Sequence, residues 1–342
     1  MSQFDYIKEI AKYGLENDQQ KLLFSLNELI EYSKKTRKVN FAIQLQSILK
    51  DVTKQRHRNG LTKIGSPIHY QPMVDGEVSD LILEKLTSEY SFDNLVCSEQ
   101  VREQLHFFIK EHKSRKLLQK YDLPVSNKLL LHGTSGCGKT LASYVLAGEL
   151  KKPMIVVNLG AIVSSKLGQT SKNLAKIFRK ASTEDCILFF DEFDSLGKLR
   201  DYNQDHAEMK RVVNSLLQLF DYLPQTSIVI AATNQKNMVD NALLRRFDTS
   251  IEFPLPDIEN IKDLVRLVLK NGHFQFDSLN VLQEFVDSVQ GLSYFSIKKI
   301  LITAIKRSLF ERQNDIWENK IIVQTDIWRE LLLKEKQEFS KD

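Results

Sequence analysis

The stretch Gly133-Thr-Ser-Gly-Cys-Gly-Lys-Thr140 decides how this chain folds. It has the spacing G-x-x-x-x-G-K-[S/T], and it joins a short apolar run at Lys128–His132 to a helix-forming run from Lys139 to about Leu150. Glycines let a loop curl until successive N–H groups point at one anion, and the N-terminus of the next helix adds a positive dipole end. We therefore predict a strand, a phosphate-binding loop and a helix, in that order.

Each residue type in this loop has a chemical role. Lys139 would place a positive charge at the β- and γ-phosphates of a nucleotide, and the Thr140 hydroxyl would bind Mg²⁺. Cys137 stands at a variable position, where we interpret it as a small filler. An ordinary glycine-rich loop is the alternative, and the flanking strand and helix argue against it. The residues predicted to bind the nucleotide here are Gly133, Thr134, Ser135, Gly136, Cys137, Gly138, Lys139, Thr140 and Leu141.

A pair of carboxylates follows the apolar run Ile187–Phe190. Asp191 and Glu192 would emerge at the edge of a parallel sheet where ligands bind. We predict that Asp191 holds Mg²⁺ through water and that Glu192 acts as the general base on the attacking water. An Asp-Glu pair after a strand is usually only a turn, but its place about fifty residues after the loop favours the catalytic interpretation.

The rest of the chain predicts an α/β fold with helical domains at both ends. Strands are expected at Met154–Asn158, Cys186–Phe190 and Ser227–Thr233, and helices at Lys172–Ala181 and Ala207–Phe220. Such repeats form a parallel sheet with flanking helices. From Pro256 onward we expect no strands, only helices at Ile261–Leu269, Leu279–Val289, Ser296–Leu309 and Asp326–Lys334.

Amphipathic spacing in residues 4–55 predicts three short helices that pack as a small bundle. Glycines and prolines then punctuate the chain from about Gly60 to Gly76, which indicates a linker. The predicted domains are therefore the bundle at 1–58, the linker at 59–90, the α/β domain at 91–256 and a helical domain at 257–342.

Composition excludes several classes of protein. With 42% hydrophobic and 27% charged residues, the 342-residue chain is not mainly disordered, and its apolar runs are too short to span a bilayer. Three scattered cysteines favour a reducing compartment, so we predict a cytoplasmic protein without a membrane partner. Residues 1–64 carry 12 Lys and Arg against 7 Asp and Glu, a balance that suits nucleic acid or an acidic partner, although a solvated helical surface is the more ordinary explanation.

Four motifs occur in order: the glycine loop, Asp191-Glu192, Ala231-Ala-Thr-Asn234 and Leu244-Arg-Arg-Phe-Asp248. Together they strongly resemble the AAA ATPase family over roughly residues 90–335. The resemblance is closest to the branch that includes katanin, spastin and the proteasomal ATPases. The chain also looks like bacterial stand-alone AAA proteins with a helical N-terminal segment, which often occur beside a subtilisin-like protease gene.

This resemblance implies ATP and Mg²⁺ as cofactors, a large ATPase domain at 91–256, a lid at 257–342 and a docking module at 1–58. Asn234, expected on the strand between the two catalytic strands, is similar to sensor 1, which orients the lytic water. Arg245 and Arg246 match the arginine fingers that reach a neighbouring subunit's γ-phosphate. One of the two could instead be a structural salt-bridge partner, and Arg246 is favoured as the essential one. Asp221 resembles the acidic residue of the inter-subunit signalling motif.

Two further segments resemble parts of the family's nucleotide site and pore. Val96 would line the adenine, and the turn Gly291-Leu-Ser293 would pack against the adenine and ribose. Lys166 stands where the branch places an aromatic pore residue. ATP hydrolysis is therefore better supported than threading of a polypeptide through the pore.

Two functions remain open. The first is an ATP-hydrolysing homo-oligomer, expected to be a hexameric ring, that remodels, unfolds or delivers a protein client docked by the N-terminal module, with a subtilisin-like protease as a candidate partner. The alternative is a nucleic-acid-dependent ATPase of the helicase-loader or transposition-regulator type, suggested by the basic N-terminal module and Lys166. Residues 1–64 contain no helix-turn-helix pattern that supports the second.

Overall fold

The structure, a computed structural model, describes residues 29, 68–70, 81–163, 169–198, 206–269, 274–277, 280–311 and 321–339. The chain divides into two compact units, Met1–Tyr70 and Gln71–Asp342. In the first unit the description covers the buried helical residue Leu29 and strand β1 (Ile68–Tyr70). The predicted N-terminal bundle otherwise lies outside the described residues, and so does Lys166.

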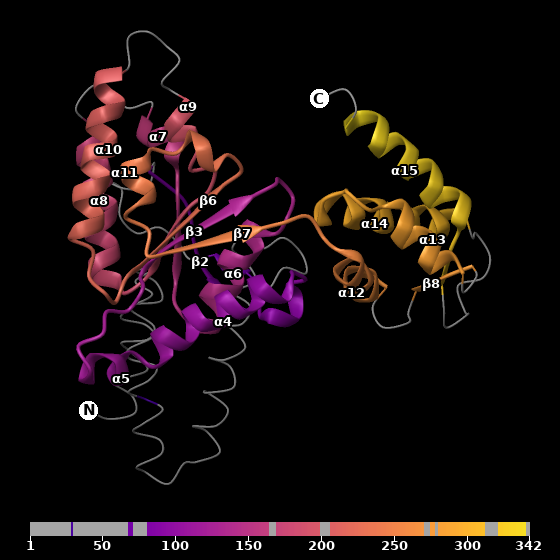
Figure 1. Cartoon of the computed structure of the whole chain (residues 1–342), viewed down its shortest axis with the longest axis horizontal. Helices are drawn as coiled ribbons and strands as arrows, with labels where there is room; N and C mark the ends of the chain where they lie inside the picture. Colours follow the sequence, from indigo (N-terminus) through magenta and orange to yellow (C-terminus); the bar gives the residue numbers. More distant parts are fainter. Residues whose placement is uncertain are drawn as a thin grey trace. The chain divides into compact units, whose positions relative to one another are not determined.

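The second unit is built on a twisted sheet of mostly parallel strands (Figure 1). Its strands lie side by side in the order β2-β4-β5-β6-β3-β7. Neighbours from β4 to β7 run parallel, whereas the edge strand β2 runs antiparallel to β4. The predicted α/β fold is thereby confirmed. The bounds are β2 Ile82–Ser88, β3 Lys128–Gly133, β4 Met154–Val157, β5 Ile187–Phe190, β6 Ile228–Thr233 and β7 Thr249–Phe253.

Burial explains the sequences of the central strands. Every residue of β4, β5 and β6 is buried, so these strands are unbroken apolar runs and not alternating ones. Helices α8 and α10 pack together on one face, and α4 and α6 on the other. The helices and 3₁₀ turns of this part are η2 Phe92–Asn94, α4 Glu99–Lys113, α5 Arg115–Lys120, α6 Lys139–Leu150, α7 Leu159–Val163, α8 Gln169–Glu184, α9 Ser195–Lys198, α10 His206–Asp221, η4 Lys236–Met238 and α11 Asn241–Leu244.

Helix α6 approaches the chain that follows β2 very closely at Gly148. A Cβ atom built on Gly148 would lie 2.2 Å from the backbone oxygen of Tyr90. Alanine in a helix interior normally gains about 0.5–1 kcal/mol over glycine, but overpacking against fixed backbone costs about 1–3 kcal/mol. We therefore expect Gly148→Ala to lower the free energy of unfolding, as measured by urea denaturation.

Gly160, in α7, is the matched control, because its Cβ would meet only the Asn158 side chain at an ordinary 3.5 Å. Gly160→Ala should leave stability unchanged or slightly raised. Equal stability of the two variants would contradict the close approach at Gly148.

The C-terminal part is helical but includes a small sheet that the sequence did not predict. Strands β8 (Phe274–Phe276) and β9 (Ile321–Val323) pair in parallel, which corrects the expectation that no strand follows Pro256. The helices among its described residues are α12 Ile258–Val268, α13 Val281–Ser288, α14 Tyr294–Glu311 and α15 Thr325–Phe339. The fully buried Trp328 packs edge-on against Phe285, with ring centroids 5.1 Å apart, and so anchors α15 to α13.

Strand β2 is a second difference from expectation, since Ile82–Ser88 lies within the stretch interpreted as a linker. Ile82 and Leu86 are buried, Leu83 is exposed, and the four polar residues of the strand are partly buried. An edge strand of this kind has a weak apolar signal, and the nearby glycines and prolines masked it.

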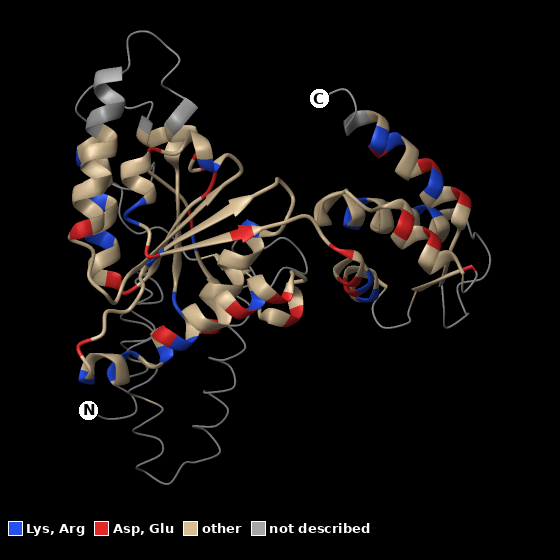
Figure 2. Ribbon diagram, in the orientation of Figure 1, with Lys and Arg blue, Asp and Glu red and all other residues tan. Residues whose placement is uncertain are grey.

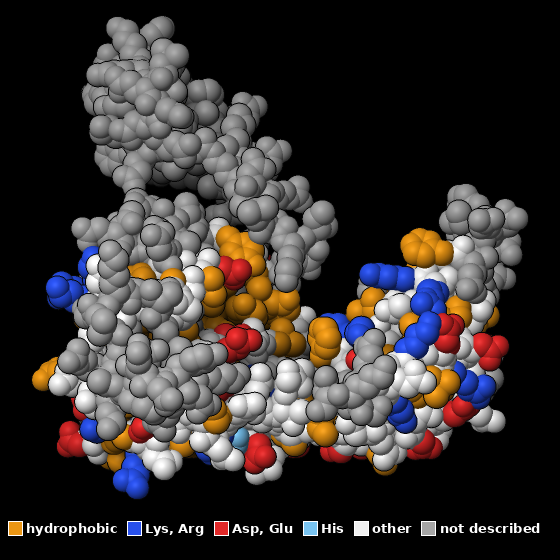
Figure 3. Space-filling view, turned by 90° about the horizontal axis from the view of Figure 1, so that it is seen from above, with side chains coloured by type: hydrophobic (Ala, Val, Ile, Leu, Met, Phe, Trp, Pro, Cys, Tyr) orange, Lys and Arg blue, Asp and Glu red, His pale blue; other side chains and the backbone are white. Residues whose placement is uncertain are grey.

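Charged residues are mixed on the described helices. Figure 2 shows Lys and Arg alternating with Asp and Glu along α15, and the space-filling view shows both signs interspersed over the C-terminal helices (Figure 3). Among the described residues, no helix is both long and apolar enough to cross a bilayer.

Candidate functional site

Three strands carry the predicted catalytic residues to one edge of the sheet. The glycine loop follows β3, Asp191 and Glu192 follow β5, and Asn234 follows β6. Because β6 lies between β5 and β3, as predicted, and all three run parallel, their carboxyl ends meet. The residues surround a cavity of about 380 Å³, a size typical of a small-ligand site.

The glycine loop wraps around the Lys139 side chain. Gly138 has a left-handed φ of 93°, after which α6 begins at Lys139. The Lys139 ammonium donates to the backbone oxygens of Gly133 and Thr134, both at 2.8 Å. Burial lowers the pKa of Lys139, while the nearby acids Asp191 and Asp194 act in the opposite direction. A polyanion in the cavity would favour the charged ammonium in the same way.

Thr140 and Asp191, the two predicted magnesium ligands, are in direct contact. The Thr140 hydroxyl donates to Asp191 Oδ2 at 3.0 Å, so α6 and β5 present two oxygen ligands together. Within the described ranges, no group of three or more His, Cys, Asp or Glu side chains could hold a metal ion. Mg²⁺ usually takes one or two protein oxygens and completes its shell with water and substrate phosphates.

Glu192 has an unusual backbone. Its φ is 50°, a left-handed conformation that is uncommon outside glycine, and its N–H donates to Asp191 Oδ1 at 2.9 Å. The side chain is exposed and borders the cavity. The left-handed turn thus brings both Asp191 and Glu192 to the cavity.

Asp194 links the ends of β5 and β6. Its buried carboxylate accepts hydrogen bonds from the Thr233 hydroxyl at 2.9 Å and the Asn234 N–H at 3.4 Å. Asp194 therefore acts as a local hydrogen-bond acceptor, and it holds the Glu192 turn and Asn234 in one arrangement.

Helix α14 of the C-terminal helical part contacts the glycine loop. The Phe295 N–H donates to the backbone oxygen of Gly136 at 3.0 Å. Gly136 has φ of 75°, and a Cβ there would lie 2.6 Å from Ser293 Oγ, so only glycine fits. Ser293 in turn accepts from the Ser296 N–H at 3.2 Å.

The cavity contains most, but not all, of the predicted nucleotide residues. Its lining includes these predicted ones: Val96, Ser135, Gly136, Gly138, Lys139, Thr140, Leu141, Asp191, Glu192 and Asn234. Gly133 and Thr134 do not line it, but their backbone oxygens accept hydrogen bonds from the Lys139 ammonium. Cys137 is buried, which raises the pKa of its thiol and disfavours the reactive thiolate.

Gly291 and Ser293 do not line the cavity. Helices α12 and α14 contribute other residues that the sequence did not identify: Leu264, Leu267, Tyr294, Phe295 and Lys298. The helical spacing of Leu264 and Leu267 was visible, but nothing local separates a pocket wall from an ordinary core face.

The two arginines lie at the opposite edge of the sheet. Both follow directly after the last residue of α11. Two residues after Arg246, the Asp248 N–H donates a hydrogen bond to the backbone oxygen of Lys128 at the start of β3. The glycine loop begins at the other end of this six-residue strand, which is roughly 17 Å away at about 3.3 Å per residue. The arginines therefore do not face the cavity of their own chain.

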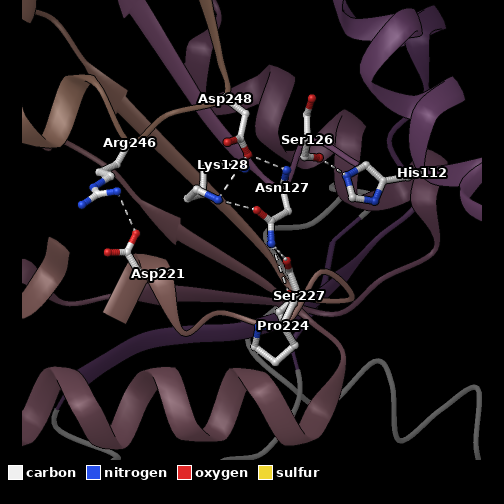
Figure 4. Close-up of polar contacts among 9 residues, drawn as sticks. All are labelled: His112, Ser126, Asn127, Lys128, Asp221, Pro224, Ser227, Arg246 and Asp248. Atoms are coloured by element: carbon white, nitrogen blue, oxygen red, sulfur yellow. Dashed lines mark hydrogen bonds and ion pairs between the residues drawn. The ribbon is translucent and has the colours of Figure 1, made fainter. Parts of the chain in front are cut away.

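Arg246 has a partner in the same chain. Its Nη1 lies 3.1 Å from Asp221 Oδ1, and both side chains are 47% exposed (Figure 4). An exposed pair of this kind contributes only about 0–1 kcal/mol, so Arg246 can exchange Asp221 for another anion. Arg245 is exposed too and makes no ion pair with any described residue.

Comparisons with known proteins identify the family of this chain. A family model, that of the ATPase family associated with various cellular activities (AAA), matches residues 129–255. An uncharacterized AAA family ATPase of Sinorhizobium fredii, y4kL, is 35% identical over 236 residues, which are 69% of this chain and 70% of that protein.

Two further relatives have more specific names. A putative 26S proteasome regulatory subunit homolog of Methanocaldococcus jannaschii is 30% identical over 67% of this chain and 62% of its own length. The ATP-dependent zinc metalloprotease FtsH 3 of Phytoplasma mali is 33% identical over 58% of this chain, but the match spans only about a third (34%) of that protein.

Proposed function

Because this chain belongs to the AAA family of ATPases, we propose that it hydrolyses ATP in the cavity at the carboxyl edge of the sheet and uses the energy to remodel, unfold or deliver a protein client. The observation that carries the proposal is the meeting of the glycine loop, the Asp191–Glu192 turn and Asn234 around one cavity. We further propose a cytoplasmic homo-oligomer, in the form of a hexameric ring.

The chain's own residues divide the work of hydrolysis. Backbone N–H groups of residues 135–140 and the Lys139 ammonium bind the phosphates, and Val96 and the lid residues Tyr294 and Phe295 border the nucleotide. Thr140 and Asp191 would hold Mg²⁺, which neutralises phosphate charge. Glu192 accepts the proton of the attacking water, and Asn234 orients that water.

The position of the arginines supports an oligomer. Since Arg245 and Arg246 lie about one strand length from the cavity of their own chain, they are placed to act on a neighbouring copy. An arginine supplied in this way makes each site complete only within an assembly. Hydrolysis and assembly are then coupled.

The names of the relatives favour a protein client over nucleic acid. One relative is a putative proteasome regulatory subunit homolog, and another is an ATP-dependent protease, which also supports a link to a partner protease such as the subtilisin-like one. The mixed charges of the described helices support the same choice, because a nucleic-acid face normally carries a continuous basic patch (Figure 2). Residues 1–58 are the proposed docking module.

Stimulation of turnover distinguishes the two candidate functions. Steady-state ATP hydrolysis should rise when casein, a permanently unfolded protein, is added, and single- or double-stranded DNA should have no effect. Glu192→Gln should retain labelled casein on the oligomer in the presence of ATP. Stimulation by DNA alone, declining steeply with salt, would favour the nucleic-acid-dependent ATPase instead.

Lys139→Ala should weaken ATP binding strongly. Hydrogen bonds to charged groups contribute about 1.5–3 kcal/mol, so losing the ammonium should raise the Kd about 10- to 150-fold. Equilibrium binding of a fluorescent ATP analogue measures the change. Lys116→Ala removes an exposed lysine of α5 and should leave the Kd unchanged. Wild-type affinity in Lys139→Ala would contradict the assignment of the glycine loop.

A further inference from the structure

A polar network joins the arginine-bearing turn to the start of β3 (Figure 4). Asp248 Oδ2 accepts from two consecutive backbone N–H groups, those of Asn127 at 2.8 Å and Lys128 at 2.9 Å. The Lys128 ammonium lies 3.4 Å from the same oxygen. In return, the Asp248 N–H donates to the Lys128 oxygen at 2.9 Å. Asp248 is thus fixed to β3 through both its side chain and its backbone.

Asn127 extends this network to the segment that carries Asp221. Its side-chain NH₂ donates to the backbone oxygens of Pro224 at 3.2 Å and Ser227 at 3.3 Å, in the connection from α10 to β6. Its Oδ1 accepts from the Lys128 ammonium at 2.8 Å. Asn127 is only 3% exposed, so these bonds are shielded from water and hold their geometry well.

The two ends of the Arg246–Asp221 pair are therefore fixed by one set of bonds. Asp248 sets the backbone two residues after Arg246, and Asn127 sets the connection that begins just after Asp221. The backbone oxygen of the preceding residue, Ser126, accepts a hydrogen bond from His112 Nε2 of α4 at 2.7 Å, which attaches the segment before β3 to α4. Burial lowers the pKa of His112 to about 4, so this contact involves a neutral imidazole at neutral pH.

The strength of these bonds argues for more than a local turn. Hydrogen bonds to a carboxylate are roughly twice as strong as neutral ones, and here two backbone N–H groups donate to one oxygen that also forms an ion pair with the Lys128 ammonium. The ion pair of Arg246 itself is exposed and weak. The guanidinium is thus free to change partners, while the backbone that carries it stays fixed.

We propose that Asp248, together with Asn127, is a positioning residue for Arg246. It holds the turn so that the guanidinium reaches the γ-phosphate bound by a neighbouring copy. The inference rests on the proposed function, in which Arg246 acts in trans. Asp248 itself does not line the cavity of its own chain, because it lies at the opposite edge of the sheet.

The test uses Asp248→Asn in the full chain. This change keeps the shape of the side chain and removes its charge. A catalytic group misplaced by about 1 Å loses about 10²-fold in rate, so kcat for ATP should fall about 10²-fold while the KM and the Kd for a fluorescent ATP analogue stay at wild-type values. Asp287→Asn, the same charge change on the exposed surface of α13, should leave all three unchanged.

Mixing separates positioning from general damage. Lys139→Ala subunits cannot bind ATP tightly, but they carry an intact Asp248 and Arg246. When they are mixed with Asp248→Asn subunits, turnover per Asp248→Asn subunit should recover, since the neighbour supplies a correctly held arginine. A purely structural defect in Asp248→Asn would not recover.

Three results would overturn the inference. They are wild-type kcat in Asp248→Asn, loss of ATP binding in that variant, and failure of the mixing rescue where Arg246→Ala is rescued. If Arg246→Ala itself shows normal turnover, the failure lies in the proposed trans arginine and not in its positioning alone.

Should Asp248→Asn not fold, Lys128→Met removes only the ammonium of the network. It should lower kcat several-fold with an unchanged Kd, and wild-type kcat there would count against the network.

Discussion

Arg246→Ala should lower the rate of ATP hydrolysis by about 10³- to 10⁵-fold while leaving ATP affinity close to that of the wild type. An arginine supplied by a neighbour contributes this much, because its charge meets the phosphate only as negative charge develops in the transition state. Arg246 is half exposed and weakly paired with Asp221, so it is available to a second copy. Single-turnover hydrolysis with radiolabelled ATP covers the required range.

Arg245→Ala is the matched control, since it removes the neighbouring guanidinium from the same turn. We expect a smaller loss, because Arg246 is favoured as the essential arginine. Arg246→Ala subunits mixed with Lys139→Ala subunits should regain turnover, each variant supplying what the other lacks. Absence of recovery, with both proteins assembled, would show that the arginine does not work across an interface. A larger loss in Arg245→Ala would exchange the two roles.

Glu192→Gln should abolish most turnover and yet keep ATP bound. Removing a general base costs about 10²- to 10⁴-fold, and glutamine preserves the size of the side chain at the strained φ of 50°. The glycine loop, Lys139 and the Thr140–Asp191 contact are untouched, so binding should persist. Phosphate release measures the rate, and mass photometry with ATP should detect an oligomer that no longer dissociates.

Glu259→Gln, on the exposed first turn of α12, controls for loss of a carboxylate and should behave as wild type. If Glu192→Gln hydrolyses ATP at the wild-type rate, Glu192 is not the base. If it loses ATP affinity, the residue contributes to the binding site and not only to the chemical step.

Much of the α/β domain was predictable because its signals are local. The observed bounds of α6 agree with the predicted Lys139–Leu150, since a glycine loop marks its start and a left-handed residue at Lys151 ends it. β5 and β6 were recognisable as buried apolar runs. Their order in the sheet followed from the expectation that Asn234 lies between the two catalytic strands.

The elements that were missed depend on distant partners. β8 and β9 are three-residue strands that pair across about 45 residues of chain, and neither has enough residues to show alternation. Tyr294, Phe295 and Lys298 reach the cavity only because α14 packs on the glycine loop. Similarly, Asp248 looked like part of a motif, and its bonds to Asn127 and Lys128 span 121 and 120 positions. Periodicity and spacing contain no information about such contacts.

The hydrogen bond from the Phe295 N–H to the Gly136 oxygen gives α14 a natural spectroscopic reporter. This amide belongs to the C-terminal helical part, and its acceptor belongs to the glycine loop, which we propose binds the phosphates. Its deuterium uptake or nitrogen chemical shift should therefore change whenever the loop moves, with no label attached near the nucleotide. One main-chain proton could in this way record, in real time, how the lid follows each cycle of binding and release.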